Sequence, residues 1–171
     1  MERVDSEAAF TAALQSFAPD IVLSDHSLAR FDSRAALEIL RAVRPTAPLI
    51  IVTGAFTDVQ TVAAVRAGAE DLILKASLGR LVPCISNALA VRRPLQTLTE
   101  RQIEVLKLVA QGYRTRDIAS RLKLGIKTVE SHRYAMMKRL RVHEVAGLVR
   151  YAIRVGLVPL EIGSRDRVSP A

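Results

Sequence analysis

The first half of the chain alternates short apolar runs with stretches of helical spacing. Three apolar runs predict buried strands at Ile21–Ser24, Leu49–Thr53 and Asp71–Leu74. Helical spacing around these runs predicts helices over Glu7–Ser16, Ser33–Val43, Val59–Ala67 and Leu78–Val91. This alternation is typical of parallel strands joined by crossover helices, so we predict an α/β segment.

The second half has no strand candidate and predicts helices only. Apolar spacing places them at Glu100–Gln111, Arg116–Leu122, Ile126–Leu140 and Glu144–Val155. Between the halves, Pro94 should stop the preceding helix, because proline cannot continue the hydrogen bonding of a helix. The predicted organisation is an α/β domain over residues 1–91, a linker over 92–97, a helical domain over 98–160 and a flexible polar tail over 161–171.

Positive charge is concentrated in the second half. Residues 1–90 hold eight Lys or Arg and ten Asp or Glu, whereas residues 91–160 hold fifteen and five. A basic surface neutralises nucleic-acid phosphates and releases their counterions, which makes polyanion binding a property of the second half. A solvated basic face without a partner would show the same charge.

The composition disfavours several classes of protein. No apolar run approaches the eighteen residues of a membrane span, and no basic and then apolar leader opens the chain. Cys84 has no second cysteine for a disulfide or a metal site, so a cytoplasmic protein is expected. No Gly-rich phosphate loop, nucleophile elbow or pair of catalytic carboxylates suggests an enzyme.

The helices predicted after the linker have the spacing of a helix-turn-helix. Thr99 and Gln102 form a capping box at the start of the first helix. On the third helix, Val129, Met136 and Leu140 share one face, which turns the polar side chains outward, where they could enter a major groove. A plain helical bundle with one polar face would have the same pattern.

This region also resembles a known family. The LuxR/FixJ (NarL-like) DNA-binding domain is similar over its whole length to Leu98–Val142, LTERQIEVLKLVAQGYRTRDIASRLKLGIKTVESHRYAMMKRLRV. TVESHR, with the basic and Leu ending at Arg139-Leu140, resembles the recognition-helix signature, and Leu148–Val158 resembles the fourth helix. The resemblance implies a four-helix LuxR-type domain that binds double-stranded DNA through helix 126–140.

The resemblance further implies which side chains contact DNA. Base-edge contacts fall on Glu130, Ser131 and Tyr134. Phosphate contacts fall on Lys127 and Thr128 and, at the start of the second helix, on Arg114, Thr115 and Arg116. Lys138 lies on the same outward face.

Three residues of the turn depart from the family pattern. Lys123 stands where glycine is frequent, Gly125 where a capping serine is frequent, and Ile126 where proline is frequent. Glycine still serves as an N-cap at a cost of roughly a few tenths of a kcal/mol, so only a slightly weakened turn is expected. His132 has no second ligand at a suitable spacing, and no metal site is predicted.

The first half resembles the receiver domain of response regulators. PDIVLSDHSL is similar to the family's third strand, IIVTG to its fourth and DLILK to its fifth. The resemblance implies a truncated CheY-like (flavodoxin-like) parallel-sheet segment, with Asp25 as the phosphoacceptor, Thr53 as the switch residue and Lys75 as the partner of the phosphoaspartate. Open parallel sheets place their sites at these carboxyl ends of strands.

The acidic pair that binds magnesium in receivers has no counterpart here. Met1–Val4 resembles the tail of the family's second strand, so we expect the first strand and its acidic pair to be absent. Asp25, a carbonyl and water make a poor octahedral site. We therefore expect no cofactor, unless a longer native chain supplies Mg²⁺ ligands, and no phosphorylation of Asp25 from the residues present. Either the start codon is misassigned, or the receiver is degenerate and serves in dimerisation or packing.

Together these features predict a DNA-binding transcriptional regulator of the two-component type. The expected partners are double-stranded DNA, a sensor histidine kinase and a second copy of the chain, since one short helix contacts only a few base pairs. The expected dimer surface is Leu148, Tyr151, Ala152 and Val155. The alternative is a phosphotransfer or protein-interaction module whose helical half docks a protein, which the basic charge disfavours.

Overall fold

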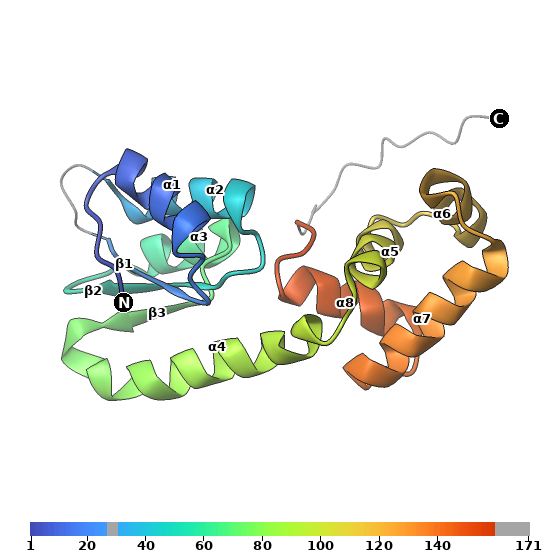
Figure 1. The fold of residues 1–171 in the computed structure, drawn as a ribbon. Helices are drawn as coiled ribbons and strands as arrows, with labels where there is room; N and C mark the ends of the chain where they lie inside the picture. The colour runs from blue at the N-terminus through green and yellow to red at the C-terminus, as the bar shows by residue number, and fades with distance from the viewer. Residues whose placement is uncertain (27–30, 160–171) are drawn as a thin grey trace.

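The computed structural model describes residues 1–26 and 31–159, and the predicted tail at 161–171 lies outside them. Its elements form an α/β half and a helical half (Figure 1). The α/β half contains α1 (Glu7–Ser16), β1 (Val22–Asp25), α2 (Ser33–Val43), β2 (Leu49–Thr53), α3 (Asp58–Ala67), β3 (Asp71–Leu74), the 3₁₀-helix η1 (Lys75–Arg80) and α4 (Leu81–Gln96). The helical half contains α5 (Glu100–Ala110), α6 (Thr115–Leu122), α7 (Ile126–Leu140) and α8 (Val145–Arg154).

Most predicted elements are confirmed. The bounds of α1, α2, α7, β2 and β3 agree with the prediction to the residue, and α3, α5, α6, α8 and β1 differ by one residue at one or both ends. The N-caps explain this agreement at helix starts. Ser6, Asp32 and Thr57 each accept a hydrogen bond from a backbone amide of the first turn.

The three strands form one parallel sheet in the order β1-β2-β3. Val22 pairs with Leu49, and Ile50 pairs with Asp71, so the strands run side by side in register. This confirms the α/β prediction for the first half. Met1–Val4, which resembles the end of a strand, is not a strand in the structure. Within the described residues β1 is therefore an edge strand.

The core of the α/β half lies between the sheet and two helices. Phe10 and Leu14 of α1 and Leu37 and Leu40 of α2 are buried against β1 and β2. Each such side chain contributes roughly 1.5–3 kcal/mol through burial. The helix α4 runs along the opposite side of the sheet toward the helical half (Figure 1).

The helical half has its own core. Side chains from all four of its helices are completely buried there, among them Leu106, Ile118, Met136 and Leu148. Val129 of α7 joins them, as its spacing predicts. This core packs α6 against α7.

Pro94 does not end the helix that precedes it, so this prediction is wrong. Instead α4 continues to Gln96. Pro94 lies in the last turn, where its missing N–H removes one hydrogen bond from the helix. Burial of Leu95 in the helical core and a bond of 2.7 Å from the Thr97 hydroxyl to the Pro94 carbonyl offset that loss. Residues 92–96 are thus helical.

Arg92 and Gly156 lie where the two halves meet. Arg92 of α4 donates to the Thr46 carbonyl at 2.8 Å and pairs with Glu70 at 2.6 Å. Gly156, which follows α8, has a positive φ of 74°, and a Cβ added there would lie 2.4 Å from the Pro45 carbonyl oxygen. The end of the helical half therefore packs closely against the α/β half.

Arg41 of α2 also lies at this junction. Its guanidinium donates to the Gly68 carbonyl at 2.6 Å. Burial lowers the pKa of Arg41, and the nearby charge of Arg92 lowers it further.

In the part of the chain that the structure describes, no helix is long and apolar enough to cross a membrane.

Candidate functional site

The helices α6 and α7 are joined by a tight turn. Lys123, after α6, adopts a left-handed conformation with φ 53°, which costs a non-glycine residue roughly 1–2 kcal/mol. Gly125 is the N-cap of α7 and makes no side-chain cap bond. The departures noted at Lys123 and Gly125 thus weaken the turn at two points without preventing it.

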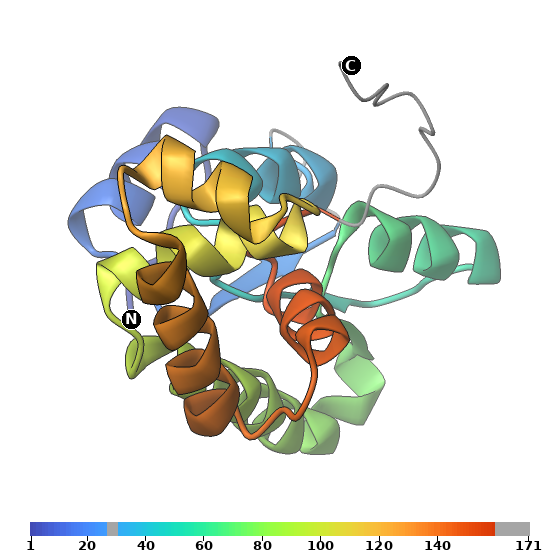
Figure 2. The ribbon, with the colours of Figure 1, turned by 90° about the vertical axis from the view of Figure 1, so that its right-hand side faces the viewer.

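The outward face of α7 carries the residues predicted to contact DNA. Val129, Met136 and Leu140 are buried on its other face. All the outward positions are exposed, and even the large aromatic side chain of Tyr134 is 69% exposed. The exposed set comprises Lys127, Thr128, Glu130, Ser131, Tyr134 and Lys138. Figure 2 shows α7 at the surface, with no other element over it.

The start of α6 lies beside this face. Arg114 and Arg116 are exposed, whereas Thr115 is half-buried. Arg133 of α7 donates a hydrogen bond of 2.8 Å to the Thr115 hydroxyl. The three predicted phosphate contacts at this helix start are therefore brought next to α7.

Three arginines tie the helices of this half together. Arg139 of α7 donates to the Thr97 carbonyl at 2.8 Å and to the Gln102 side chain at 2.9 Å. Arg101 of α5 donates to the Leu122 carbonyl, at the end of α6. Together with Arg133, these contacts were not predicted. Arg101 and Arg133 each lie beside an apolar stripe, which is their one sequence signal, whereas Arg139 is exposed and lacks that signal.

The predicted dimer surface on α8 is wrong. Leu148, Ala152 and Val155 have no exposed area and belong to the helical core. Tyr151 is partly buried, and its hydroxyl donates to the Val91 carbonyl at 3.3 Å. Burial raises the pKa of Tyr151. An amphipathic helix usually turns its apolar stripe to its own core, and α8 does so.

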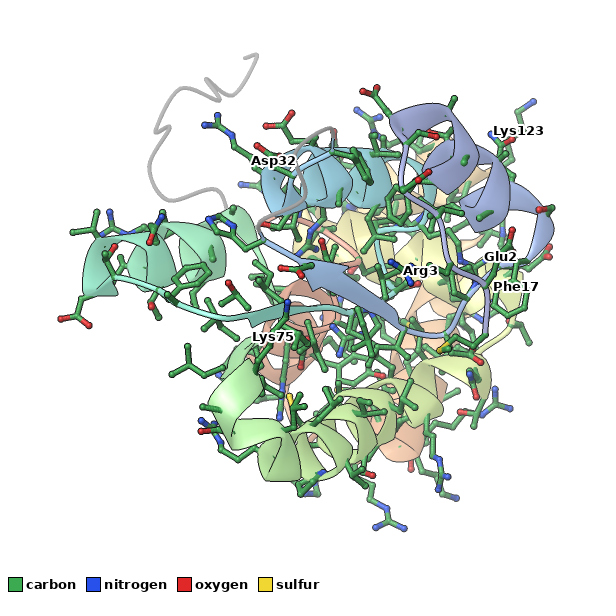
Figure 3. All side chains as sticks on the ribbon, turned by 90° about the vertical axis from the view of Figure 1, so that its left-hand side faces the viewer. Glu2, Arg3, Phe17, Asp32, Lys75 and Lys123 are labelled. Carbon is green, nitrogen blue, oxygen red and sulfur yellow. The ribbon has the colours of Figure 1, made fainter. Side chains whose placement is uncertain are left out.

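In the α/β half, the ends of the three strands bring Asp25 and Lys75 together. The Lys75 ammonium lies 2.7 Å from the Asp25 carboxylate, and it reaches from the end of β3 toward the end of β1 (Figure 3). Thr53, at the end of β2, is buried, and its hydroxyl donates to the Ala55 carbonyl at 3.2 Å. The Lys75 ammonium is thus paired with the carboxylate of Asp25, the residue that resembles the phosphoacceptor of receivers.

These strand ends do not fit a magnesium site. Among residues 1–26 and 31–159, no three His, Cys, Asp or Glu side chains lie close enough to hold a metal ion. The Lys75 ammonium lies 2.7 Å from the Asp25 carboxylate, and this cation would repel a divalent ion. The donor set is therefore unsuited to a metal with carboxylate ligands.

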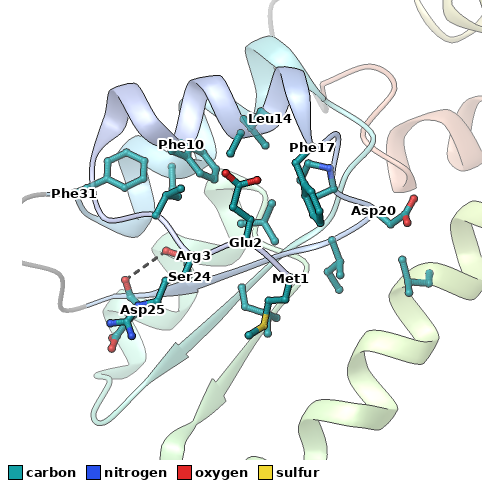
Figure 4. A pocket seen from close by; sticks show the side chains of 18 residues that line it. Met1, Glu2, Arg3, Phe10, Leu14, Phe17, Asp20, Ser24, Asp25 and Phe31 are labelled. Atoms are coloured by element: carbon teal, nitrogen blue, oxygen red, sulfur yellow. Dashed lines mark hydrogen bonds between the residues drawn. The ribbon is translucent and has the colours of Figure 1, made fainter.

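A cavity of about 540 Å³ runs along the outer edge of β1. Its walls are mostly apolar and include Phe10, Leu14 and Phe31 (Figure 4). Arg3 and Asp25 also line it. The cavity therefore adjoins the strand-end carboxylate of Asp25.

The thiol of Cys84, on α4, is hydrogen-bonded to a carboxylate. It donates a hydrogen bond of 3.1 Å to the Asp71 carboxylate. Partial burial and this bond raise the pKa of Cys84 to about 11. The thiolate, which is the nucleophilic form, is therefore scarce at neutral pH.

Two family models match the chain. The model described as the response regulator receiver domain matches residues 1–85. The model described as bacterial regulatory proteins, luxR family, matches residues 96–152. The receiver model covers Asp25, Thr53 and Lys75 at the strand ends, and the luxR-family model covers α6, the turn and α7.

Several curated proteins are similar in sequence. The tetrathionate response regulatory protein TtrR of Salmonella typhimurium is 29% identical over 154 residues, which cover 84% of this chain and 75% of that protein. The response regulator protein VraR of Staphylococcus aureus is 26% identical, with 82% and 77% covered. The oxygen regulatory protein NreC of Staphylococcus haemolyticus is 36% identical over 73 residues, 43% of this chain and 34% of that protein.

Solved structures show a looser similarity. Full-length FixJ from B. japonicum is 25% identical, with 91% of this chain and 84% of that chain covered and a TM-score of 0.45. RcsB from Salmonella enterica serovar Typhimurium, bound to promoter rprA, is 23% identical, with 88% and 83% covered and a TM-score of 0.43.

Proposed function

Because the chain belongs to the response regulators that carry a LuxR-family DNA-binding domain, we propose that α7 binds duplex DNA in a sequence-specific manner. The observation that carries this proposal is the exposed polar face of α7 beside the basic start of α6. A helix displayed in this way fits the major groove, and the surrounding positive charge attracts the phosphates.

The contacts divide into two kinds. Lys127, with Arg114 and Arg116, supplies positive charge for phosphates. Ser131 and Tyr134 lie on the outward face of α7, where hydroxyl groups can bond to base edges. Affinity for any duplex then depends mainly on the first group, and preference among sequences on the second.

Duplex binding by three variants tests this division. Lys127→Ala should weaken binding to selected and random duplexes alike and reduce the slope of log K against log salt by about 0.9, as expected for one lost phosphate contact. Ser131→Ala and Tyr134→Phe should keep the slope and change which sequences are enriched from a random duplex library. Equal losses on every duplex for all three variants would contradict the division of labour.

We propose that the DNA-bound form is a homodimer. A single helix such as α7 spans only a few base pairs, and a two-fold dimer doubles the site on a palindrome. The buried stripe of α8 leaves Val145, Ala146 and Arg150 exposed on its other side, next to the half-buried Val149. We therefore propose this exposed side of α8, and not its buried stripe, as the surface that contacts the second chain.

Sedimentation on a full palindrome should give two chains per duplex for the wild type, and one chain per duplex for Val149→Glu. One wild-type chain on the full site would contradict the dimer.

For the α/β half, we propose that duplex binding does not require phosphorylation of Asp25. This rests on the uncovered face of α7 in a structure in which Asp25 pairs with Lys75. Asp25→Asn should therefore bind a mixed-sequence duplex within about twofold of the wild type, as expected for a surface change remote from the contact. The receiver resemblance implies a sensor histidine kinase as the partner of this half. To test Asp25 as the phosphoacceptor, the protein is incubated with acetyl phosphate and Mg²⁺ and then run on phosphate-affinity electrophoresis.

A further inference from the structure

Arg133 differs from the other polar residues of α7 in the direction that it faces. At about 100° per residue, Arg133 lies within roughly 60° of the buried Val129, Met136 and Leu140 around the helix. Ser131 and Tyr134 lie roughly 100° or more away on the outward face. Arg133 thus belongs to the flank of α7 that meets α6.

The contact of Arg133 falls on a helix start that has no cap of the usual kind. Arg114 occupies the N-cap position of α6, and its side chain has no oxygen to accept a bond from the first-turn amides. Asp117 accepts a bond of 3.3 Å from the Arg114 amide. A bond from outside α6 also fixes this turn, because Arg133 of α7 donates to the Thr115 hydroxyl at 2.8 Å.

We propose that Arg133 is a positioning residue, which fixes the start of α6 and the Thr115 hydroxyl relative to α7 for phosphate binding. The proposal rests on DNA binding as the function of α7. The Thr115 oxygen accepts from the guanidinium, so its own proton remains to be donated to a phosphate. A hydroxyl that accepts from a cation is polarised, which strengthens the bond it donates.

Positioning and direct contact predict different salt dependences. An arginine bound to a phosphate releases about one counterion, so its loss lowers the slope of log K against log salt by about 0.9. A threonine hydroxyl is neutral, and losing its bond weakens binding without changing the slope. Loss of Arg133 should therefore resemble loss of Thr115 in both affinity and slope.

The first experiment needs no DNA. Hydrogen exchange of the Asp117 and Ile118 amides, both of which donate to the Arg114 carbonyl at 3.0 Å, reports the order of the first turn of α6. We expect these amides to exchange at least threefold faster in Arg133→Gln than in the wild type, and nearly as slowly in Arg133→Lys. Arg93→Gln, an equal loss of charge on α4, should leave them unchanged. Unchanged exchange in Arg133→Gln would overturn the proposal, whether or not the protein binds DNA.

The second experiment is a double-mutant cycle on a 30-base-pair duplex of mixed sequence. Arg133→Gln and Thr115→Val should each weaken binding roughly three- to tenfold, the range of one hydrogen bond, with an unchanged salt slope. The double variant should be no weaker than the weaker single variant, and Thr115→Ser should bind like the wild type. Multiplying losses, or a slope lowered by about 0.9 in Arg133→Gln alone, would show that Arg133 contacts phosphate itself. No binding by the wild type would refute the proposed function and leave the exchange result to decide on positioning.

Discussion

The two candidate sites differ in how their charged groups are satisfied. At the strand ends, Asp25 meets a cation of the same chain, Lys75, at 2.7 Å. On α7, the polar residues predicted to contact DNA face outward, whereas Arg133 and Arg139 donate hydrogen bonds to groups of their own chain. A recognition surface keeps its hydrogen-bond donors available for an external polyanion, whereas at the strand ends the charge of Asp25 is neutralised by Lys75 of the same chain.

The two halves also have separate cores. Each half buries a separate set of apolar side chains, and Leu95 of α4 belongs to the helical set although α4 starts in the α/β half. The halves are therefore distinct in packing but share one helix.

The largest effect is expected in the cores. Leu106→Ala and Leu40→Ala each remove a buried leucine and should lower the free energy of unfolding by roughly 2–5 kcal/mol. Urea unfolding followed by circular dichroism measures the loss. Only Leu106→Ala should reduce duplex binding at 25 °C. An equal loss of binding in Leu40→Ala would show that the halves fold as one unit.

A smaller loss of stability is expected when the hydrogen bonds from Arg139 of α7 to Thr97 and Gln102 are removed. Arg139→Gln removes the bonds to the Thr97 carbonyl and the Gln102 side chain and should destabilise the helical half by roughly 1.5–3 kcal/mol, as bonds from a charged group do. Lys138→Gln, a neighbouring exposed change, should leave the unfolding midpoint in urea where it is. The same midpoint for both variants would mean that Arg139 adds no stability.

The junction can be probed with two glycines. Gly156→Ala and Gly112→Ala both place a side chain in a left-handed conformation, which costs roughly 1–2 kcal/mol. Space is open around Gly112, but at Gly156 the new methyl group would meet the Pro45 carbonyl. Only Gly156→Ala should therefore separate the halves, seen as an increased radius of gyration in solution scattering. Equal radii for the two variants would contradict a close junction.

The smallest effect is expected at the strand-end pair. Lys75→Met removes the partner of Asp25, and because both side chains are partly exposed we expect a change of about 0–1 kcal/mol that shrinks further in high salt. Duplex affinity should stay the same. A larger loss, insensitive to salt, would show that the pair is an important part of the α/β fold.

Local patterns predicted most of the elements and part of the sites. Strands such as Leu49–Thr53 and helices such as Ile126–Leu140 follow from spacing within one segment, and the meeting of Asp25 with Lys75 follows from parallel strand order. The outward face of α7 follows from the same periodicity. These features need no knowledge of distant contacts.

The misses all depend on contacts between segments. Pro94 is accommodated because Leu95 has a core to enter, and Leu148 of α8 is buried because α5 covers it. The bond from Arg133 to Thr115 joins residues eighteen positions apart and leaves no periodic trace. A helical pattern shows which side chains share a face but not which neighbour that face meets.

The unbroken course of α4 also constrains how such a chain can be recombined. Since α4 carries side chains of both halves, each inserted residue would turn the helical half by about 100° and shift it by 1.5 Å along the axis. An insertion of one or two residues would aim α7 in a new direction, whereas seven residues would nearly restore its heading about 10 Å farther out. Helical phase, more than linker length, is then the quantity to conserve in a chimera or in an insertion that arises by evolution.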